Sequence, residues 1–362
     1  GAMEGLGMSR FDPSIRSGRR VLLTGHTGFK GTWLAHWLQM MGAEVSGCAL
    51  PPDTALSLYQ LTELDQDFSD CFGDVRDVAR LRAIVDAVRP QTVLHMAAQP
   101  LVRRSVREPV VTFDVNVMGT VNLLEALRQV EGLESILVIT TDKVYENAEI
   151  GTAFRETDAL GGHDPYSASK AAAELVVSSY ARAYFNEKGM PVATARGGNV
   201  IGGGDFSEDR IIPDVVRAHL AGELPTVRNP NATRPWQHVL DCLEGYLLYT
   251  QELTRGRDLP RAMNFGPTGA ANLPVCNLVE VMQATLGSKF GWQGEAAPQP
   301  HEMQALALDC TKAQELLGFQ DRLTGHAAIK ETAQWYLEWA KGSNMREFTR
   351  ERIRERIALL TA

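Results

Sequence analysis

A short apolar segment that runs into a glycine-rich turn sets the first limit on the fold of this chain. Arg20–Thr24 leads directly into Gly25-His-Thr-Gly28-Phe-Lys-Gly31, and an amphipathic segment from Thr32 to about Met41 follows. A strand, a glycine turn and a helix in this order are typical of dinucleotide-binding folds, because glycines permit a tight turn and the helix N-terminus offers free N–H groups to a pyrophosphate. The spacing is G-x-x-G-x-x-G rather than G-x-G-x-x-G. A plain glycine turn is therefore the alternative, but the flanking strand and helix favour the dinucleotide site.

The rest of the first half alternates short apolar segments with longer amphipathic ones. Repetition at intervals of about 25 residues predicts an α/β fold with a Rossmann-type, doubly wound parallel sheet, whose ligands bind beyond the carboxyl ends of the strands. The alternation weakens after Gly197, which predicts a smaller C-terminal α/β lobe for the substrate. The further strands are expected at Glu44–Leu50, up to Asp70–Asp74, at Thr92–Ala97, Ser135–Ile139 and Pro191–Arg196.

Length and composition are those of a globular protein. The chain has 362 residues, 44% hydrophobic and 22% charged, and its net charge of -8 gives no reason to expect a nucleic-acid partner. No run approaches the roughly 20 apolar residues of a membrane span, so no membrane partner is expected. Five scattered cysteines without metal-ligand spacing suit a reducing cytoplasm and predict no metal site. We expect residues 1–18 to be a tag (Gly1-Ala2-Met3) and an extension, and residues 19–196 to form the nucleotide-binding domain, with further segments returning to it at about 238–266. The second lobe is expected mainly over 197–340, and a helical extension over 341–362.

Polar residues follow the predicted strand Ser135–Ile139. Thr140-Thr141-Asp142-Lys143 place two hydroxyls, a carboxylate and an ammonium at its carboxyl end. Downstream, Tyr166 and Lys170 are four residues apart at the start of a predicted helix that runs to about Lys188, so they share one face. An ammonium near a phenol lowers the pKa of the phenol by stabilising the phenolate, which makes a general base for work near neutral pH. The pair alone is common on surface helices, and its weight comes from the cleft predicted upstream.

Three further residues bear on the nucleotide site. The second strand ends at prolines and Asp53 comes only after them, with no arginine for a 2′-phosphate, which favours NAD over NADP. Asp74 either contacts the adenine or caps the helix that follows it, and both interpretations stay open. Asn116 faces inward in the helix predicted from about Pro109 to Arg128, and we expect it to bond a neighbouring backbone because buried polar groups need partners.

The second half carries arginines suited to an anionic substrate. Arg228 to His238 is predicted to be a polar loop between prolines, and its Arg234 is the first candidate for phosphate binding because guanidinium groups pair bidentately with phosphate oxygens. Arg210 is the second candidate, and surface arginines are the plainer alternative. The tail, Arg346–Leu360, mixes Arg and Glu at helical spacing and is most simply a solvated helix, although it could dock on an acidic partner.

The motifs in their order resemble the extended short-chain dehydrogenase/reductase family. The similarity runs from about Arg19 to Tyr336, and within the family it is greatest to the 4,6-dehydratases that act on CDP-glucose. The stretches that carry it are Gly28-Phe-Lys-Gly31, Ala98-Gln-Pro-Leu-Val-Arg-Arg-Ser105, Thr141-Asp-Lys-Val-Tyr145, Gly198-Asn-Val-Ile-Gly-Gly-Gly-Asp205 and Ala232-Thr-Arg-Pro-Trp-Gln-His238.

The resemblance implies an NAD-dependent lyase with an internal redox cycle. NAD+ would take a hydride from C4 of the hexose while Tyr166 takes the O4 proton. Lys170 would lower the pKa of the Tyr166 phenol and hold the nicotinamide ribose, and Thr141 would form a hydrogen bond with O4. The 4-ketone would acidify the C5 proton, Asp142 would protonate the departing C6 hydroxyl, and the hydride would return to C6. Lys143 stands where related enzymes that act on dTDP-glucose have a glutamate. Lys143 could be the C5 base, if its pKa falls far below the usual value of about 10.4. Alternatively, Lys143 could only orient Asp142.

The resemblance also implies a nucleotide-sugar substrate and a homodimer built from the helices at about Pro109–Arg128 and Ser167–Lys188. A nucleotide-sugar 4-epimerase or a dehydratase for another nucleotide-hexose is the alternative, and a non-catalytic dinucleotide-binding scaffold is a remote one. The residues assigned to NAD are Gly25, Thr27, Gly28, Phe29, Lys30, Gly31, Asp74, Val75, Ala97, Ala98, Gln99, Thr140, Tyr166 and Lys170. Those assigned to the substrate are Gln99, Arg103, Ser105, Asn199, Arg210, Arg234, Gln237 and His238.

Overall fold

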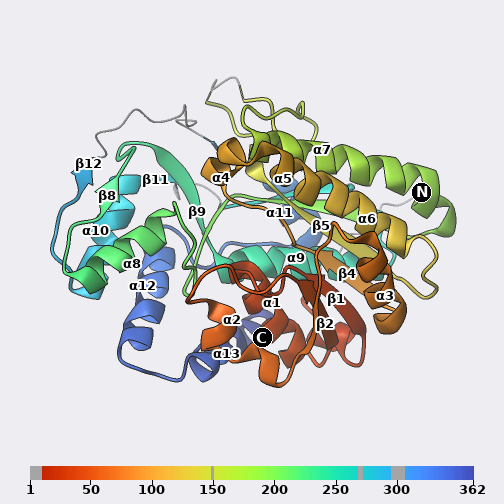
Figure 1. Ribbon diagram of the computed structural model, residues 1–362, viewed down its shortest axis with the longest axis horizontal. Helices are drawn as coiled ribbons and strands as arrows, with labels where there is room; N and C mark the ends of the chain where they lie inside the picture. The colour runs from red at the N-terminus through yellow and green to blue at the C-terminus, as the bar shows by residue number, and fades with distance from the viewer. Residues whose placement is uncertain (1–9, 148–150, 268–271, 295–305) are drawn as a thin grey trace.

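The computed structural model describes residues 10–147, 151–267, 272–294 and 306–362. The tag expected at Gly1-Ala2-Met3 lies outside these residues. Figure 1 shows a larger body, which holds most of the N-terminal half, and a smaller lobe at the left of the view.

The larger body is built on a seven-stranded sheet in which every strand is parallel to its neighbours. The strand order is β10-β6-β5-β4-β1-β2-β3, which is the doubly wound arrangement that the alternation predicted. A parallel sheet needs cover on both faces, and all seven residues of β5 are accordingly buried. The strands are β1 (Arg20–Thr24), β2 (Glu44–Ala49), β3 (Ser69–Phe72), β4 (Thr92–His95), β5 (Ser135–Thr141), β6 (Val192–Gly197) and β10 (Ala262–Phe265).

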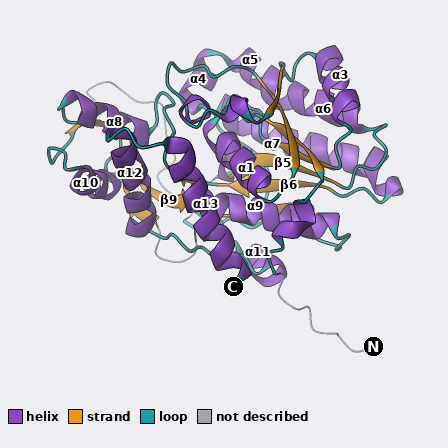
Figure 2. Ribbon diagram, turned by 90° about the horizontal axis from the view of Figure 1, so that it is seen from below, coloured by secondary structure: helices purple, strands orange, loops and turns teal. Residues whose placement is uncertain are grey.

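Successive strand residues feed two separate cores. Leu22 belongs to the core shared with α3 (Val78–Val88), α6 (Gly119–Leu127) and α7 (Pro165–Tyr180). Its neighbour Leu23 belongs to the core on the other face. That second core includes α1 (Phe29–Met40) and α9 (Val239–Thr254), and Figure 2 shows the strands between the two helix layers.

The helix predicted at about Pro109–Arg128 is interrupted by a π-turn. It consists of α5 (Pro109–Phe113), a π-turn at Asp114–Met118, and α6. The expectation that no run has the length of a membrane span was wrong here, because Pro109–Leu127 reaches 19 residues with mean hydropathy 1.3. The helix packs against α3 and α7, and Leu123, Leu124 and Leu127 serve the covering layer of the sheet, whereas Val110 and Met118 on its other side are exposed. Asn116 within it exchanges two hydrogen bonds with the Gln99 backbone, at 2.8 and 3.1 Å, which confirms its structural role.

The smaller lobe combines two small sheets with three helices. One sheet has the order β11-β9-β7 and the other pairs β12 with β8. The prediction of a polar loop over Arg228 to His238 was wrong for its second half, because Thr233–His238 forms strand β9 between two partners. The elements are β7 (Asn199–Ile201), β8 (Thr226–Val227), β9, β11 (Asn272–Pro274), β12 (Gln293–Gly294), α8 (Ile211–Ala221), α10 (Val275–Leu286) and α12 (His326–Ala340).

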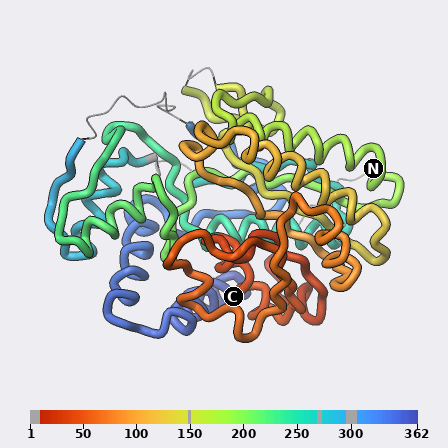
Figure 3. The backbone as a smooth tube through the Cα atoms, in the orientation of Figure 1, coloured from red at the N-terminus to blue at the C-terminus, as the bar shows by residue number. Residues whose placement is uncertain are grey.

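The C-terminal helix α13 (Met345–Thr361) is not a solvated appendage, as its charge pattern had suggested. It returns to the larger body and packs on α1, so the last segment of the chain lies beside one of the first (Figure 3). Ile353 is fully buried, and Arg356 is buried in contact with Asp241 and Glu244 of α9. The remaining short helices are Pro13–Arg16, α2 (Leu58–Leu61), Leu64–Gln66, α4 (Val102–Arg107), Asp142–Val144, Ala181–Phe185, Asn186–Lys188 and α11 (Thr311–Leu317).

Candidate active site

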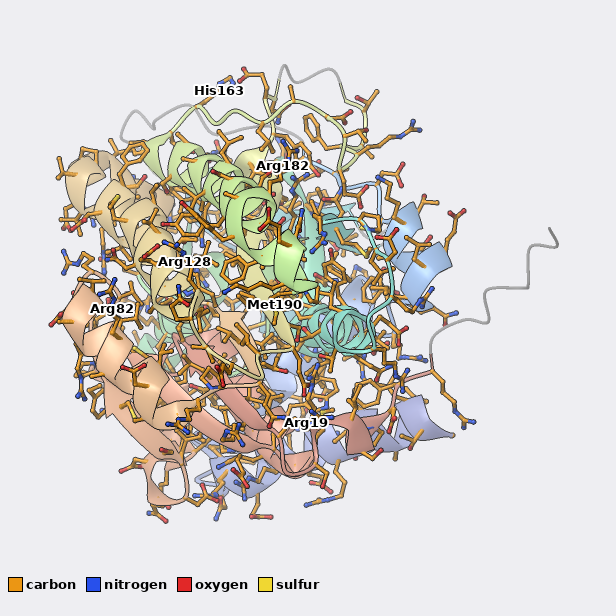
Figure 4. All side chains as sticks on the ribbon, turned by 90° about the vertical axis from the view of Figure 1, so that its right-hand side faces the viewer. Arg19, Arg82, Arg128, His163, Arg182 and Met190 are labelled. Carbon is orange, nitrogen blue, oxygen red and sulfur yellow. The ribbon has the colours of Figure 1, made fainter. Side chains whose placement is uncertain are left out.

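The carboxyl ends of the central strands gather the residues that the motifs singled out. Thr24 is level with His95, and Thr141 is level with Gly197, so β1, β4, β5 and β6 end at one edge of the sheet. The opposite edge, where β1 and β6 begin, carries Arg19 and Met190 (Figure 4). Because ligands of doubly wound sheets bind at the carboxyl edge, the candidate site lies there.

The glycine turn fits a dinucleotide. Gly25 has φ +77°, and a Cβ on it would lie 2.7 Å from the Ala97 nitrogen, so only glycine suits this position. A Cβ on Gly31 would lie 2.0 Å from the Gly25 carbonyl oxygen, which shows how closely α1 folds back on the turn. Gly28 is different: it is exposed at the N-terminus of α1 and its Cβ would meet only the Gly25 oxygen, at 3.4 Å. The turn is thus closely packed at Gly25 and Gly31 and open to solvent at Gly28. On this open side a pyrophosphate would meet the free N–H groups at the N-terminus of α1.

Three side chains of the turn point in different directions. The Thr27 hydroxyl donates to the Leu50 carbonyl at 2.8 Å and so links the turn to the end of β2. Phe29 lies against Gly202 of the second lobe. Lys30 extends toward α9, where its Nζ lies 3.5 Å from the Tyr246 hydroxyl. Lys30 is therefore directed into the protein interior, which leaves the backbone N–H groups of the turn as the groups on its outer side that could meet a phosphate.

The residues that follow β3 and β4 are either small or paired with other residues of the protein. Asp74 is held by Arg76, which lowers the pKa of its carboxyl group, and the cap of α3 is Asp77 instead. The capping interpretation of Asp74 was therefore wrong. Val75 is buried against Gly119 of α6. Ala97 and Ala98 follow β4 beside the glycine turn, where their small side chains leave room for a ligand.

Two residues assigned to ligands have other partners in the fold. The Gln99 amide donates to the Leu101 carbonyl and the Thr112 hydroxyl, at 3.1 and 2.9 Å, and accepts from the Leu101 nitrogen. Its side chain shapes the loop after β4. The Thr140 hydroxyl donates to Glu174 at 2.6 Å inside the protein. Because consecutive strand residues face opposite sides of the sheet, Thr141 is the one of the two threonines that faces the cleft.

Tyr166 and Lys170 lie one turn apart at the start of α7. Asp164 caps this helix, and Pro165 occupies its first position. The Tyr166 nitrogen donates to the Ser105 hydroxyl at 3.1 Å, and the Lys170 Nζ donates to the Ile139 carbonyl at 3.0 Å. The helix start is therefore attached to both α4 and β5.

The two groups titrate differently from the expectation. Burial raises the pKa of Tyr166 to about 12, while a hydrogen bond with Thr141 and the charge of Arg210 act in the opposite direction. Burial lowers the pKa of Lys170 to about 7, and the nearby Lys30 lowers it further. Lys170 Nζ itself donates to the Ile139 carbonyl.

Asp142 presents an unpaired oxygen at the same place. Its Oδ1 accepts from the Thr141 hydroxyl at 2.9 Å and lies 3.8 Å from Lys143 Nζ. Its Oδ2 is buried and finds no hydrogen-bond partner among the residues that the structure describes. Gly198, the nearest backbone of the second lobe, adds no side chain in front of it. Because buried polar atoms are normally paired, the free oxygen points to a ligand group that completes it.

The second lobe contributes more unpaired polar atoms. The Asn199 amide nitrogen is buried without a partner, and so are both amide atoms of Gln237, all within the described parts of the chain. Asn199 lies on β7, directly after Gly198, and Val200 of the same strand is level with Gln237 on β9. Asn199 itself is level with Trp236, one residue before Gln237, so the Asn199 and Gln237 side chains lie on opposite faces of the small sheet. The unpaired polar atoms of the second lobe are therefore divided between these two faces.

The arginines assigned to the substrate lie in the second lobe and at its border with the larger body. Arg210, at the start of α8, binds Asp205 at 2.9 Å and acts on Tyr166 through its charge. Arg103, on α4, binds Asp209 at 2.9 Å, so it joins the two lobes. Arg234 is buried on β9 and donates to its neighbour's carbonyl at 2.9 Å.

Two of the residues assigned to the substrate have structural roles. The Ser105 hydroxyl is fully buried between the Val102 carbonyl and the Tyr166 nitrogen, so it positions Tyr166. His238 caps α9 by accepting from the Leu240 nitrogen at 3.3 Å, and burial lowers its pKa to about 3. The cap agrees with the plainer interpretation of a histidine at a helix start.

Sequence reasoning missed Glu174 and Tyr246. Glu174 is one turn beyond Lys170 on α7, and its carboxylate binds Thr140, Thr194 and Arg196 inside the protein. Its spacing of four from Lys170 could have revealed it. Tyr246 comes from α9, more than two hundred residues after Lys30, and nothing in the sequence connects the two.

Comparison with known proteins agrees with this geometry. A family model described as GDP-mannose 4,6 dehydratase matches residues 22–332. The chain belongs to this family. It is 42% identical to the CDP-glucose 4,6-dehydratase of Salmonella typhimurium over 92% of its own length and 95% of that enzyme. Among solved structures it is similar to the dTDP-glucose 4,6-dehydratase DesIV of Streptomyces venezuelae, solved with NAD bound, with a TM-score of 0.76, 26% identity and coverage of 90% and 99%.

The GDP-mannose 4,6 dehydratase family shares its fold with epimerases. The chain is 26% identical to the UDP-glucose 4-epimerase of Thermus thermophilus, solved in complex with NAD, with a TM-score of 0.75 over 87% of this chain and 98% of that one. The fold therefore accommodates both classes of reaction. The choice between them depends on the residues at the strand ends.

Proposed function

We propose that this protein is an NAD-dependent 4,6-dehydratase of a nucleotide-sugar, and that it converts CDP-D-glucose to CDP-4-dehydro-6-deoxy-D-glucose and water. The class of reaction is supported by the family and by the relative that is 42% identical over nearly the whole of both chains. The choice of cytidine is supported by that relative's specificity alone. NAD is supported by the open outer side of the glycine turn and by the nucleotide in the related structures.

The free Oδ2 of Asp142 is the observation that carries the proposal. It lies beside Thr141, whose hydroxyl donates to the other oxygen of the same carboxylate, and has no partner among the described residues. A dehydratase needs an acid to protonate the leaving hydroxyl at C6, whereas a 4-epimerase has no leaving group. A carboxyl group held within the cleft with one oxygen unused is suited to that acid.

The chain's own groups take the following parts in the reaction. When bound, NAD+ supplies the acceptor for the hydride from C4 and returns it later. Tyr166 removes the proton from O4, with Thr141 hydrogen-bonded to the same oxygen, and Lys170 and Arg210 supply positive charge that favours the phenolate. The C5 proton passes to a general base in the cleft while Asp142 protonates O6, so that the C6–O6 bond breaks and water departs; the same base returns the proton to C5 once a hydride has been added at C6.

We propose that Lys143 orients Asp142. Its Nζ lies 3.8 Å from Asp142 Oδ1, which leaves Oδ2 to face the substrate. A role as the C5 base predicts that Lys143→Arg, which keeps the charge and cannot deprotonate at neutral pH, abolishes turnover. Orientation by charge predicts that Lys143→Arg keeps most of the activity and that Lys143→Met loses it.

The nucleotide-sugar is proposed to lie between the lobes. Asn199 and Gln237 carry amide groups that have no partner among the described residues of the second lobe, and Arg210 and Arg234 are suited to the diphosphate. Arg103 and the lobe over 197–340 would form the outer wall.

Incubation of the purified protein with CDP-glucose and NAD+ tests the function. A 4-keto product that absorbs in alkali is expected, with no net change in NADH. A C4 epimer of CDP-glucose would show that the protein is an epimerase. The absence of any product with every nucleoside-diphosphate glucose would refute the proposal that the protein is an enzyme of this kind. Tyr166→Phe should lower kcat by roughly 10²–10⁴-fold, the usual contribution of a general base. A Tyr166→Phe variant as fast as the parent would contradict the mechanism.

We also propose a homodimer through α5, the π-turn and α7. Large apolar side chains are exposed there, including Val110 at 79% and Leu175 at 62%. Ala171 and Ala173 pack inward, so the contact would be made by the larger residues. Leu175→Arg should convert the dimer to a monomer in sedimentation; a monomeric parent protein would refute the proposal. A cytoplasmic location is proposed because the five cysteines are all unpaired thiols.

A further inference from the structure

Glu174 is a buried carboxylate with an unusually complete set of donors. Its two oxygens accept from the Thr140 hydroxyl at 2.6 Å, the Thr194 hydroxyl at 2.8 Å, and the Nε and NH2 groups of Arg196 at 3.0 and 2.8 Å. Arg196 is itself buried and donates to the Tyr145 hydroxyl at 2.8 Å. The pair therefore ties α7 to the ends of both β5 and β6.

Glu174 and Lys170 bind consecutive residues of the same strand. Lys170 Nζ donates to the Ile139 carbonyl at 3.0 Å, and Glu174 accepts from Thr140, the next residue of β5. Two contacts one helical turn apart fix both the height and the rotation of α7 against β5. The next residue of β5 is Thr141, so the same contacts determine where Tyr166 meets it.

We propose that Glu174 is a positioning residue of the proposed dehydratase, which holds Tyr166 against Thr141 and keeps Lys170 in its charged form. The inference rests on the proposed function. Glu174 does not touch the cleft itself, because Thr140, Thr194 and Arg196 surround its carboxylate. Its effect on the reaction passes through Lys170 and the register of α7.

The charged and titratable groups around Lys170 act in opposite directions. Glu174 on α7 favours the ammonium form, whereas burial and Lys30, from α1, favour the neutral amine. His95 on β4 is also close, and its own pKa is lowered to about 3 by burial and by Lys170, so it adds no positive charge near neutral pH. Glu174 is thus the one negative charge among these groups that acts on Lys170.

Opposite charge changes should move the pH profile in opposite directions. If Lys170 serves as the ammonium beside the phenolate, turnover falls on the alkaline side as Lys170 loses its proton. Glu174→Gln removes the negative charge and should move this alkaline limb of kcat to lower pH by roughly one unit. Lys30→Met removes a positive charge and should move it to higher pH, with both variants measured at saturating NAD+ and CDP-glucose.

Two further variants separate positioning from simple loss of stability. Glu174→Asp keeps the charge with a shorter reach and should restore the alkaline limb to its original pH. Glu252→Gln removes a similarly buried carboxylate, which binds Arg255 and Arg257 at the far end of α9, and should lower the melting temperature without moving the limb.

The proposal is overturned if Glu174→Gln leaves the alkaline limb in place, or if Glu252→Gln moves it equally. It is also overturned if Glu174→Gln and Lys30→Met shift the limb in the same direction. Because the parent enzyme is assayed first, failure to form a 4-keto product identifies failure of the proposed function. A crystal structure of Glu174→Gln gives an independent readout: α7 displaced from β5 is expected, and Lys170 still 3.0 Å from Ile139 with α7 in place would contradict the positioning role.

Discussion

Gly31 and Gly28 allow the folding role of the glycine turn to be separated from its binding role. In Gly31→Ala, the new Cβ would lie 2.0 Å from the Gly25 oxygen and 2.9 Å from the His26 Cα. Both are backbone atoms, so no side chain can rotate away and the turn has to open. Overpacking of this kind costs about 1–3 kcal/mol or more. With an unfolding entropy of about 2 cal/mol/K per residue over 362 residues, the melting temperature should fall by roughly 1–4 °C.

Gly28→Ala makes the matched control at the same turn. Gly28 has φ −78°, which alanine adopts freely, and its Cβ would approach only the Gly25 oxygen, at 3.4 Å. The melting temperature of the ligand-free protein should therefore stay within about 1 °C of the parent value. The methyl group, however, would project from the exposed side of the turn, where the pyrophosphate approaches the backbone. NAD+ should bind roughly tenfold or more weakly, a loss of about 1.4 kcal/mol.

Thermal unfolding without nucleotide and calorimetric titration with NAD+ measure the two effects separately. Gly31→Ala should lose both stability and NAD+ affinity, because the turn itself is distorted, whereas Gly28→Ala should lose affinity alone. Equal melting temperatures for the two variants would show that the close contact at Gly31 relaxes without cost. Parental NAD+ affinity in Gly28→Ala would show that the cofactor does not approach the turn as proposed.

Two other perturbations test the C-terminal helix and the proposed acid. Arg356→Met should lower the free energy of unfolding by about 3–5 kcal/mol near pH 7, because it leaves the carboxylate of Asp241 buried without its cation and leaves Glu244 with Arg322 alone, at 3.4 Å. Urea unfolding measures the loss against the exposed Arg354→Met, and equal losses would contradict the prediction. Burial already raises the pKa of Glu244, and loss of Arg356 raises it further, so the folded state binds a proton more tightly than the unfolded state and the loss should shrink as the pH falls toward the ordinary carboxyl range. Asp142→Asn should lower kcat by roughly 10²–10⁴-fold with little change in KM, and an unchanged kcat would remove Asp142 from the chemistry.

The central sheet and the glycine turn could be predicted because their signals are local. Each strand is a short apolar run, and the parallel arrangement follows from the alternation with helices. Tyr166 and Lys170 were found for the same reason, since their spacing of four is visible in the chain. The titration of these two groups was not predictable, because it depends on how deeply α7 is buried and on Arg210 and Lys30, which come from distant segments.

The misassigned segments failed where tertiary contacts decide the structure. Arg228 to His238 contains two prolines and two arginines, which suggested a loop, yet its second half forms β9 because β7 and β11 lie on either side of it. The charge pattern of α13 suggested solvent on every side. Arg356 is nevertheless buried, because it forms ion pairs with Asp241 and Glu244 of α9, which lie more than a hundred residues earlier in the chain. Neither partner can be identified from the segment itself.

The glycines at the end of β6 and directly after it allow close packing near the candidate site, which the sequence pattern only partly indicated. Glycine-rich segments suggest room for a ligand, but here much of the room is filled by the protein itself. A Cβ on Gly197 would lie 2.4 Å from the Tyr246 hydroxyl, and one on Gly203 would lie 1.9 Å from the Trp335 ring. Gly198 differs, because its Cβ would lie 3.2 Å from the free Oδ2 of Asp142 and would narrow the approach to that oxygen. Of these glycines, Gly198 is therefore the one whose missing side chain serves the proposed chemistry. Gly197 allows α9 to pack closely on β6 within the larger body, and Gly203 allows α12 to pack closely within the second lobe.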